Sequence, residues 1–161
     1  MKGPTPLKRH PAIVSFSKDH HFGLLLVWKI RQGLAKEVDA ERISNYILFF
    51  FTEDLEKHFK DEEQLLFCKL PVNDTLRKQA EKEHQSIYNL INAIQKNKND
   101  TDLIRRLADD LERHIRFEER ELFNHLQNII PPDVLEEIAA GTSNNDKATN
   151  EKWKDVFWEE K

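Results

Sequence analysis

Two stretches of the sequence repeat one another and decide the fold. Residues 53–70 read EDLEKHFKDEEQLLFCKL, and residues 109–126 read DDLERHIRFEERELFNHL. At a constant offset, Asp54, Leu55, Glu56, His58, Glu62, Glu63, Leu66, Phe67 and Leu70 recur as Asp110, Leu111, Glu112, His114, Glu118, Glu119, Leu122, Phe123 and Leu126. The two stretches are therefore versions of one helical unit.

A weaker repeat links two further segments. Residues 18–20 (KDH) resemble residues 82–84 (KEH), and apolar residues follow both at helical spacing. His20 aligns with His84, whereas His21 aligns with a glutamine. We therefore predict that His20 faces the core, with His21 as the alternative.

The apolar spacing extends these repeats into four helices. The expected helices span about residues 15–35, 39–70, 74–96 and 100–130. The candidate N-caps are Asp39, Asn73 or Asp74, and Asp100 or Thr101. Because the three connections are short, neighbouring helices should pack antiparallel, which predicts an all-α, up-down-up-down four-helix bundle.

The two ends of the chain differ from the bundle. The prolines Pro4, Pro6 and Pro11 predict an irregular N-terminal arm, and a short helix is expected at about residues 133–140. We predict that residues 1–140 form the bundle with its arm, and that residues 141–161 form a linker and an amphipathic C-terminal tail. A helical tail would place three apolar residues on one face, and we expect them to pack on the bundle as a lid: Trp153, Val156 and Phe157.

Composition narrows the range of functions. The chain has 161 residues, 34% of them charged, only four glycines and a net charge of −4, which favours one helical domain and predicts neither a nucleic-acid nor a membrane partner. The longest apolar run, residues 22–28, is too short to span a bilayer, and no signal peptide is predicted. The single cysteine, Cys68, excludes an internal disulfide. We therefore expect a cytoplasmic protein, of undetermined oligomeric state.

The chemistry is predicted by polar residues on apolar helix faces. His58 and Glu62, like His114 and Glu118, are four residues apart and so share one face. Burying imidazoles and carboxylates without partners would cost several kcal/mol each, and a bound metal removes that cost. Imidazoles with carboxylates suit a pair of iron ions, with manganese or zinc as alternatives. The predicted metal ligands are His20, His58, Glu62, His84, His114 and Glu118.

Other polar residues allow two interpretations each. Asp54 and Asp110 lie one turn before the ligand histidines and either orient an imidazole or lie at the surface. Tyr88 either donates a hydrogen bond to a metal-bound ligand or packs in the core. Glu63 and Glu119 are expected to face solvent or neighbouring helices.

The motifs at these positions resemble the hemerythrin-like (HHE cation-binding) family over about residues 8–130. They are DHH at residues 19–21, HFKDEE at 58–63, EH at 83–84 and HIRFEERELF at 114–123. The resemblance implies a non-haem di-iron centre, oxo- or hydroxo-bridged, in which Glu62 and Glu118 bridge the metals and the four histidines are terminal ligands.

One departure separates this sequence from the oxygen-carrying hemerythrins. Those carriers have a fifth histidine where this chain has Tyr88, and an aspartate at i+5 where this chain has Glu118 at i+4. The pattern is closer to the four-histidine, two-glutamate sites of iron–sulfur cluster repair proteins and related bacterial proteins.

Counting ligands favours a site that binds a small molecule. Two six-coordinate irons offer about 12 positions, of which the six side chains fill roughly 8 and a bridging oxygen two more, leaving about two. The sequence thus predicts a di-iron protein that binds O2 or NO for sensing, storage or detoxification. The alternatives are a di-iron oxidoreductase of peroxidase or NO reductase type, and an iron donor for iron–sulfur cluster repair.

Overall fold

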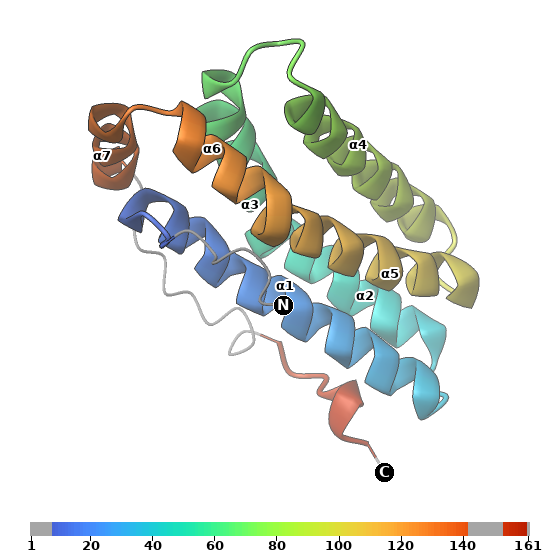
Figure 1. The fold of residues 1–161 in the computed structure, drawn as a ribbon. Helices are drawn as coiled ribbons and strands as arrows, with labels where there is room; N and C mark the ends of the chain where they lie inside the picture. Colours follow the sequence, from blue (N-terminus) through green and yellow to red (C-terminus); the bar gives the residue numbers. More distant parts are fainter. Residues whose placement is uncertain (1–7, 142–152, 161) are drawn as a thin grey trace, which may run out of the picture.

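The computed structural model describes residues 8–141 and 153–160, and within these ranges every regular element is helical. The helices pack lengthwise in a bundle (Figure 1). Four continuous helical segments form it, each called a rod below. They are α1 (Pro11–Ala35); α2 (Ala40–Phe50), η1 (Phe51–Leu55), α3 (Glu56–Asp61), η2 (Glu62–Leu66) and η3 (Phe67–Lys69); α4 (Thr75–Lys96); and α5 (Thr101–Phe117), η4 (Glu118–Leu122) and α6 (Phe123–Ile129). The predicted all-α bundle is confirmed. None of the helices in the described ranges combines the length and the apolar composition needed to cross a membrane.

Side-chain caps set where the rods begin. Asp39, Asp74 and Asp100 each accept a hydrogen bond from a backbone N–H in the first turn that follows. The first helix begins at Pro11, earlier than predicted, and His10 caps it by accepting a bond from the Ala12 N–H over 3.0 Å. Pro11 was wrongly assigned to an irregular arm, because a proline that would break a helix interior is well suited to its first position.

Two of the rods contain a π-helical turn at the same place in the repeat. One begins at Glu62 and the other at Glu118, so each predicted carboxylate ligand starts a wider turn inside a continuous rod. A π turn fits one extra residue into the helix and is often found at functional sites. The repeat seen in the sequence is thus also a repeat in backbone geometry.

A layer of polar side chains divides the apolar core in two. Val27 and Ile87 belong to one cluster of buried residues, and Phe16 and Leu122 belong to the other. Along each rod the histidine predicted as a ligand lies between residues of the two clusters, as His20 does between Phe16 and Val27. The core therefore has an apolar end, a polar middle and a second apolar end.

The C-terminal residues pack on one end of the bundle without forming the predicted helix. After α7 (Pro132–Gly141), residues 153–156 are not helical, and η6 (Phe157–Glu159) is a single 3-10 turn. Phe157 is fully buried, in space left by Gly33, where a Cβ atom would lie 2.8 Å from the Phe157 ring. Val156 is exposed, so the prediction of one shared helical face was wrong, whereas packing of the tail on the bundle is confirmed. The predicted linker, residues 142–149, lies outside the described residues.

Candidate metal centre

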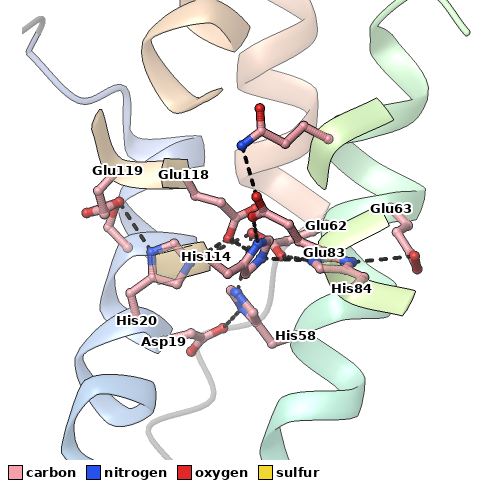
Figure 2. A network of polar contacts seen from close by, with 12 residues as sticks. Asp19, His20, His58, Glu62, Glu63, Glu83, His84, His114, Glu118 and Glu119 are labelled. Atoms are coloured by element: carbon pink, nitrogen blue, oxygen red, sulfur yellow. Dashed lines mark hydrogen bonds and ion pairs between the residues drawn. The ribbon is translucent and has the colours of Figure 1, made fainter. Parts of the chain in front are cut away.

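The six predicted ligands meet in the polar middle layer, one or two from each rod (Figure 2). His20 lies on α1, His58 on α3, His84 on α4 and His114 on α5, while Glu62 and Glu118 open the two π turns. All six are buried, and both carboxylates are fully so. His21, the alternative to His20, is exposed.

The six side chains form two groups of four that share both carboxylates. One group is His20, His58, Glu62 and Glu118, and the other is His84, His114, Glu62 and Glu118; in each, the ligand atoms lie within 4.8 Å of one another. Glu62 turns one oxygen to each group: Oε2 lies 3.4 Å from His58 Nε2, and Oε1 lies 3.1 Å from His84 Nε2. Glu118 Oε1 lies 2.9 Å from His20 Nε2 and 3.2 Å from His114 Nε2. Both carboxylates are therefore placed to bridge two positions.

Several atoms of this layer have unmet bonding capacity. Among the described residues, His58 Nε2, Glu62 Oε2 and Glu118 Oε2 are buried and have no hydrogen-bond partner. Burying such atoms is costly unless something binds them. Two donors bound to one metal ion at about 2.1 Å lie roughly 3 Å apart at a right angle and about 4 Å apart when opposite, which suits the spacings found here. The residues therefore fit a cation in each group.

The charges in this layer are strongly coupled. Burial alone would lower the pKa of His114, but the carboxylates of Glu118, Glu83 and Glu62 together outweigh it and raise the pKa to about 10. Burial likewise opposes protonation of His58, yet Glu62 raises its pKa well above the usual range. Burial would raise the pKa of Glu118, but His114 holds it well below the ordinary range. The carboxylates thus attract cations strongly, and protons and metal ions compete for the same imidazoles.

Four further carboxylates, which the sequence did not reveal, approach the outer nitrogens of the histidines, and two of them, Asp19 and Glu83, make hydrogen bonds there. The four contacts from carboxylate oxygen to Nδ1 are Asp19 to His58 at 3.0 Å, Glu83 to His114 at 2.7 Å, Glu119 to His20 at 3.3 Å, and Glu63 to His84 at 3.5 Å. Each comes from a different rod than the histidine it contacts, and each is the sequence neighbour of a ligand. Partners of this kind fix the orientation of a ligating imidazole and raise its basicity.

The structure decides between interpretations that the sequence left open. Glu63 and Glu119 face neighbouring helices, as expected, and there approach the imidazoles of His84 and His20. Asp110 pairs with Arg113 at 3.0 Å, and Asp54 lines a cavity. Tyr88 packs edge-on against the Phe59 ring with a centroid distance of 5.7 Å, and burial raises its pKa to about 12, so it belongs to the core wall. The adjacency of Asp19 to His20 and of Glu83 to His84 was the available signal.

A cavity of about 420 Å³ opens beside this layer, and its lining includes His20, His58 and His114. Its walls are mainly apolar, with aromatic rings from α1, α2 and α3. His84 does not line it. The cavity therefore borders both histidines of the first group and one histidine of the second.

Comparison with known proteins agrees with the geometry. The family model of the hemerythrin HHE cation-binding domain matches residues 14–126. Comparison with curated proteins gave no match, and neither did comparison with solved structures. The matched range contains all six clustered residues and all four outer carboxylates. With a helical bundle, a buried layer of histidines and glutamates and this match over most of its length, the chain belongs to the hemerythrin HHE cation-binding domain family and carries a metal-binding site.

Proposed function

We propose that the metal-binding site holds two iron ions and that the pair binds a small ligand such as O2 or NO, for sensing, storage or detoxification. The observation that carries the proposal is the sharing of Glu62 and Glu118 by two groups of ligand atoms. Each ion would be held by two imidazoles, with both carboxylates bridging: His20 and His58 for one ion, His84 and His114 for the other.

The donor set supports iron in particular. Mixed imidazole and carboxylate donors suit iron, which can change oxidation state while remaining bound, and an iron pair would supply the redox or ligand-binding chemistry. Four histidines and two bridging carboxylates leave about two of some 12 positions unfilled by protein once a bridging solvent ligand is counted. The chain itself contributes the orientation of the imidazoles, through Asp19, Glu63, Glu83 and Glu119, and an apolar cluster on each side of the polar layer.

Metal analysis tests the ion pair. Protein purified from iron-replete cells should contain about two irons per chain, and fewer than about one metal per chain would contradict the proposal. The double variant His58→Ala, His114→Ala removes one imidazole from each group and should lose the metal. His21→Ala, which removes the neighbouring exposed histidine, is the matched control and should keep it.

Rapid mixing separates binding from turnover. The reduced, iron-loaded protein is mixed with O2 or NO, and the absorbance is followed over several equivalents. One persistent spectral change per iron pair supports binding. Repeated consumption of the gas in the presence of a reductant would instead support an oxidoreductase.

A further inference from the structure

The cavity beside His20 and His58 is far larger than a diatomic molecule requires. Its volume is about 420 Å³, more than ten times the roughly 30 Å³ that one water occupies in the liquid. Cavities that bind small organic molecules begin at about 300 Å³. A route for O2 or NO alone does not account for this space.

The walls of the cavity favour a ligand that contains an aromatic ring. Four phenylalanines line it, Phe16, Phe22, Phe50 and Phe59, together with Leu65 and Leu111. Aromatic side chains favour offset or edge-on contacts with another ring. An apolar ring can thus replace water against the phenylalanine and leucine side chains of the wall.

The charged residues of the lining disfavour an anion. They comprise two lysines, Lys18 and Lys57, and four acidic residues, Asp19, Glu53, Asp54 and Asp61. Lys57 is already paired with Asp61 at 2.7 Å. Away from the histidines of the metal centre, acidic residues thus outnumber lysines in the lining, which disfavours a carboxylate or phosphate there and is compatible with a neutral molecule.

The buried histidines of the lining give the ligand a defined orientation. His20, His58 and His114 line the cavity, and His20 and His58 belong to one group of candidate metal ligands. A hydroxyl group presented there can be bound by the ion that these histidines hold. We propose that the cavity binds a small neutral phenol as a ligand or substrate of the metal centre, with its ring among the phenylalanines; only the coordination of its hydroxyl rests on the proposed function.

Binding of 4-fluorophenol to the protein as purified tests this proposal. Equilibrium dialysis, with the free concentration measured by fluorine NMR, should give saturable binding at one site per chain with a Kd below about 1 mM. The same ring carrying a negative charge, 4-fluorobenzoate, should bind about tenfold more weakly. Absence of saturable phenol binding, or benzoate binding equally well, would overturn the proposal.

A pair of variants tests whether 4-fluorophenol binds in the cavity. Leu65→Trp fills the cavity from η2 and should weaken phenol binding about tenfold or more. Glu121 occupies the equivalent place in the second repeat, is exposed and lies outside the cavity lining. Glu121→Trp therefore adds the same bulk without filling the cavity and should leave the Kd within about twofold of the wild type. Equal binding by both variants would overturn the assignment.

Two further measurements keep the outcome unambiguous. Far-ultraviolet circular dichroism checks that Leu65→Trp is folded, and if it is not, Ser15→Trp fills the same cavity from α1 and is expected to weaken binding likewise. Metal content is measured on every sample. Phenol binding by protein that contains no metal would support phenol binding in the cavity and contradict the iron pair. Two irons per chain without phenol binding would support the iron pair and contradict phenol binding in the cavity.

Discussion

In the half of the metal centre formed by α1 and α3, His20 and His58 border a cavity, whereas in the half formed by α4 and α5 His84 packs against aromatic rings. The Phe59 ring stacks on His84 at a centroid distance of 3.9 Å, and Phe67 lies 5.3 Å away. His20 has one stacked neighbour, Phe123, at 5.2 Å. The two halves have the same donors but different access.

The repeat identifies residues that differ between the halves. Gly23, in the cavity lining, corresponds to Ile87, which is buried in the core. Phe59, stacked on His84, corresponds to Ile115 in the second repeat. The two groups of donors thus differ in their surroundings: His20, His58 and His114 border the cavity, whereas His84 is enclosed by aromatic rings.

The largest expected effect is on the free energy of unfolding, which should fall by different amounts when a histidine is removed from each half. In the metal-free protein, His84→Ala leaves a void beneath Phe59 and removes a partner of buried Glu62, so we expect a loss of about 3–5 kcal/mol. His20→Ala opens toward the cavity, where water can enter and hydrate Glu118, so its loss should be about 1–2 kcal/mol smaller. Urea unfolding with an unchanged m-value measures both, and equal losses would mean that the halves are equally enclosed.

A smaller effect is expected from the outer carboxylates. Glu83→Gln and Asp19→Asn each replace the anion behind one ligand imidazole and should weaken metal binding about 10- to 100-fold. The Glu83 contact is shorter, 2.7 Å against 3.0 Å, and its side chain is 29% exposed against 50% for Asp19. Solvent screens the more exposed contact, so Glu83→Gln should cause the larger loss in a chelator competition assay. The opposite order would show that exposure does not set the strength of these contacts.

The response to pH should change sign when metal binds. In the metal-free protein the pKa of His114 is raised from its ordinary 6.5 to about 10, and those of His20, His58 and His84 are also raised. Their protonation therefore stabilises the fold fully below about pH 6.5, and this stability is lost as the pH rises toward 10. The melting temperature of the metal-free protein should fall over that range.

Metal requires the deprotonated imidazole, so the extra stability given by metal should grow over the same pH interval. Parallel melting curves with and without metal measure both trends. The variant His114→Gln should flatten the metal-free slope near pH 10. An unchanged slope would show that groups other than His114 cause the pH dependence of the melting temperature.

The smallest effect is expected at Gly23. A Cβ atom there would lie 2.8 Å from Ile115 Cδ1, the end of a flexible side chain that can move aside. Alanine also favours the helix over glycine by roughly 1 kcal/mol, so Gly23→Ala should change the unfolding free energy by less than about 1 kcal/mol. A loss of several kcal/mol in urea unfolding would show that α1 and α5 cannot adjust, and that this glycine is required for the packing of the open half.

Periodicity and repetition were sufficient to predict the bundle and the cluster of six side chains. His58 with Glu62 and His114 with Glu118 are local pairs, because a spacing of four residues places both on one helix face whatever surrounds the helix. The alignment of His20 with His84 then selected the remaining imidazoles. Aspartates before the apolar pattern predicted three helix starts, since a capping bond is made within one turn.

The outer carboxylates, the tail and the cavity were decided by tertiary structure. Glu63 lies next to Glu62 in the sequence, yet it contacts His84 on another rod, and that contact depends on which rods are neighbours. The tail residue Phe157 is held by a gap at Gly33 and not by a helical face of its own. The cavity is lined by residues from several segments, α1, α3 and α5 among them, so it depends on how these segments fit together. Local spacing fixes which face of a helix a residue occupies, but contacts and empty space between helices depend on how all the rods fit together.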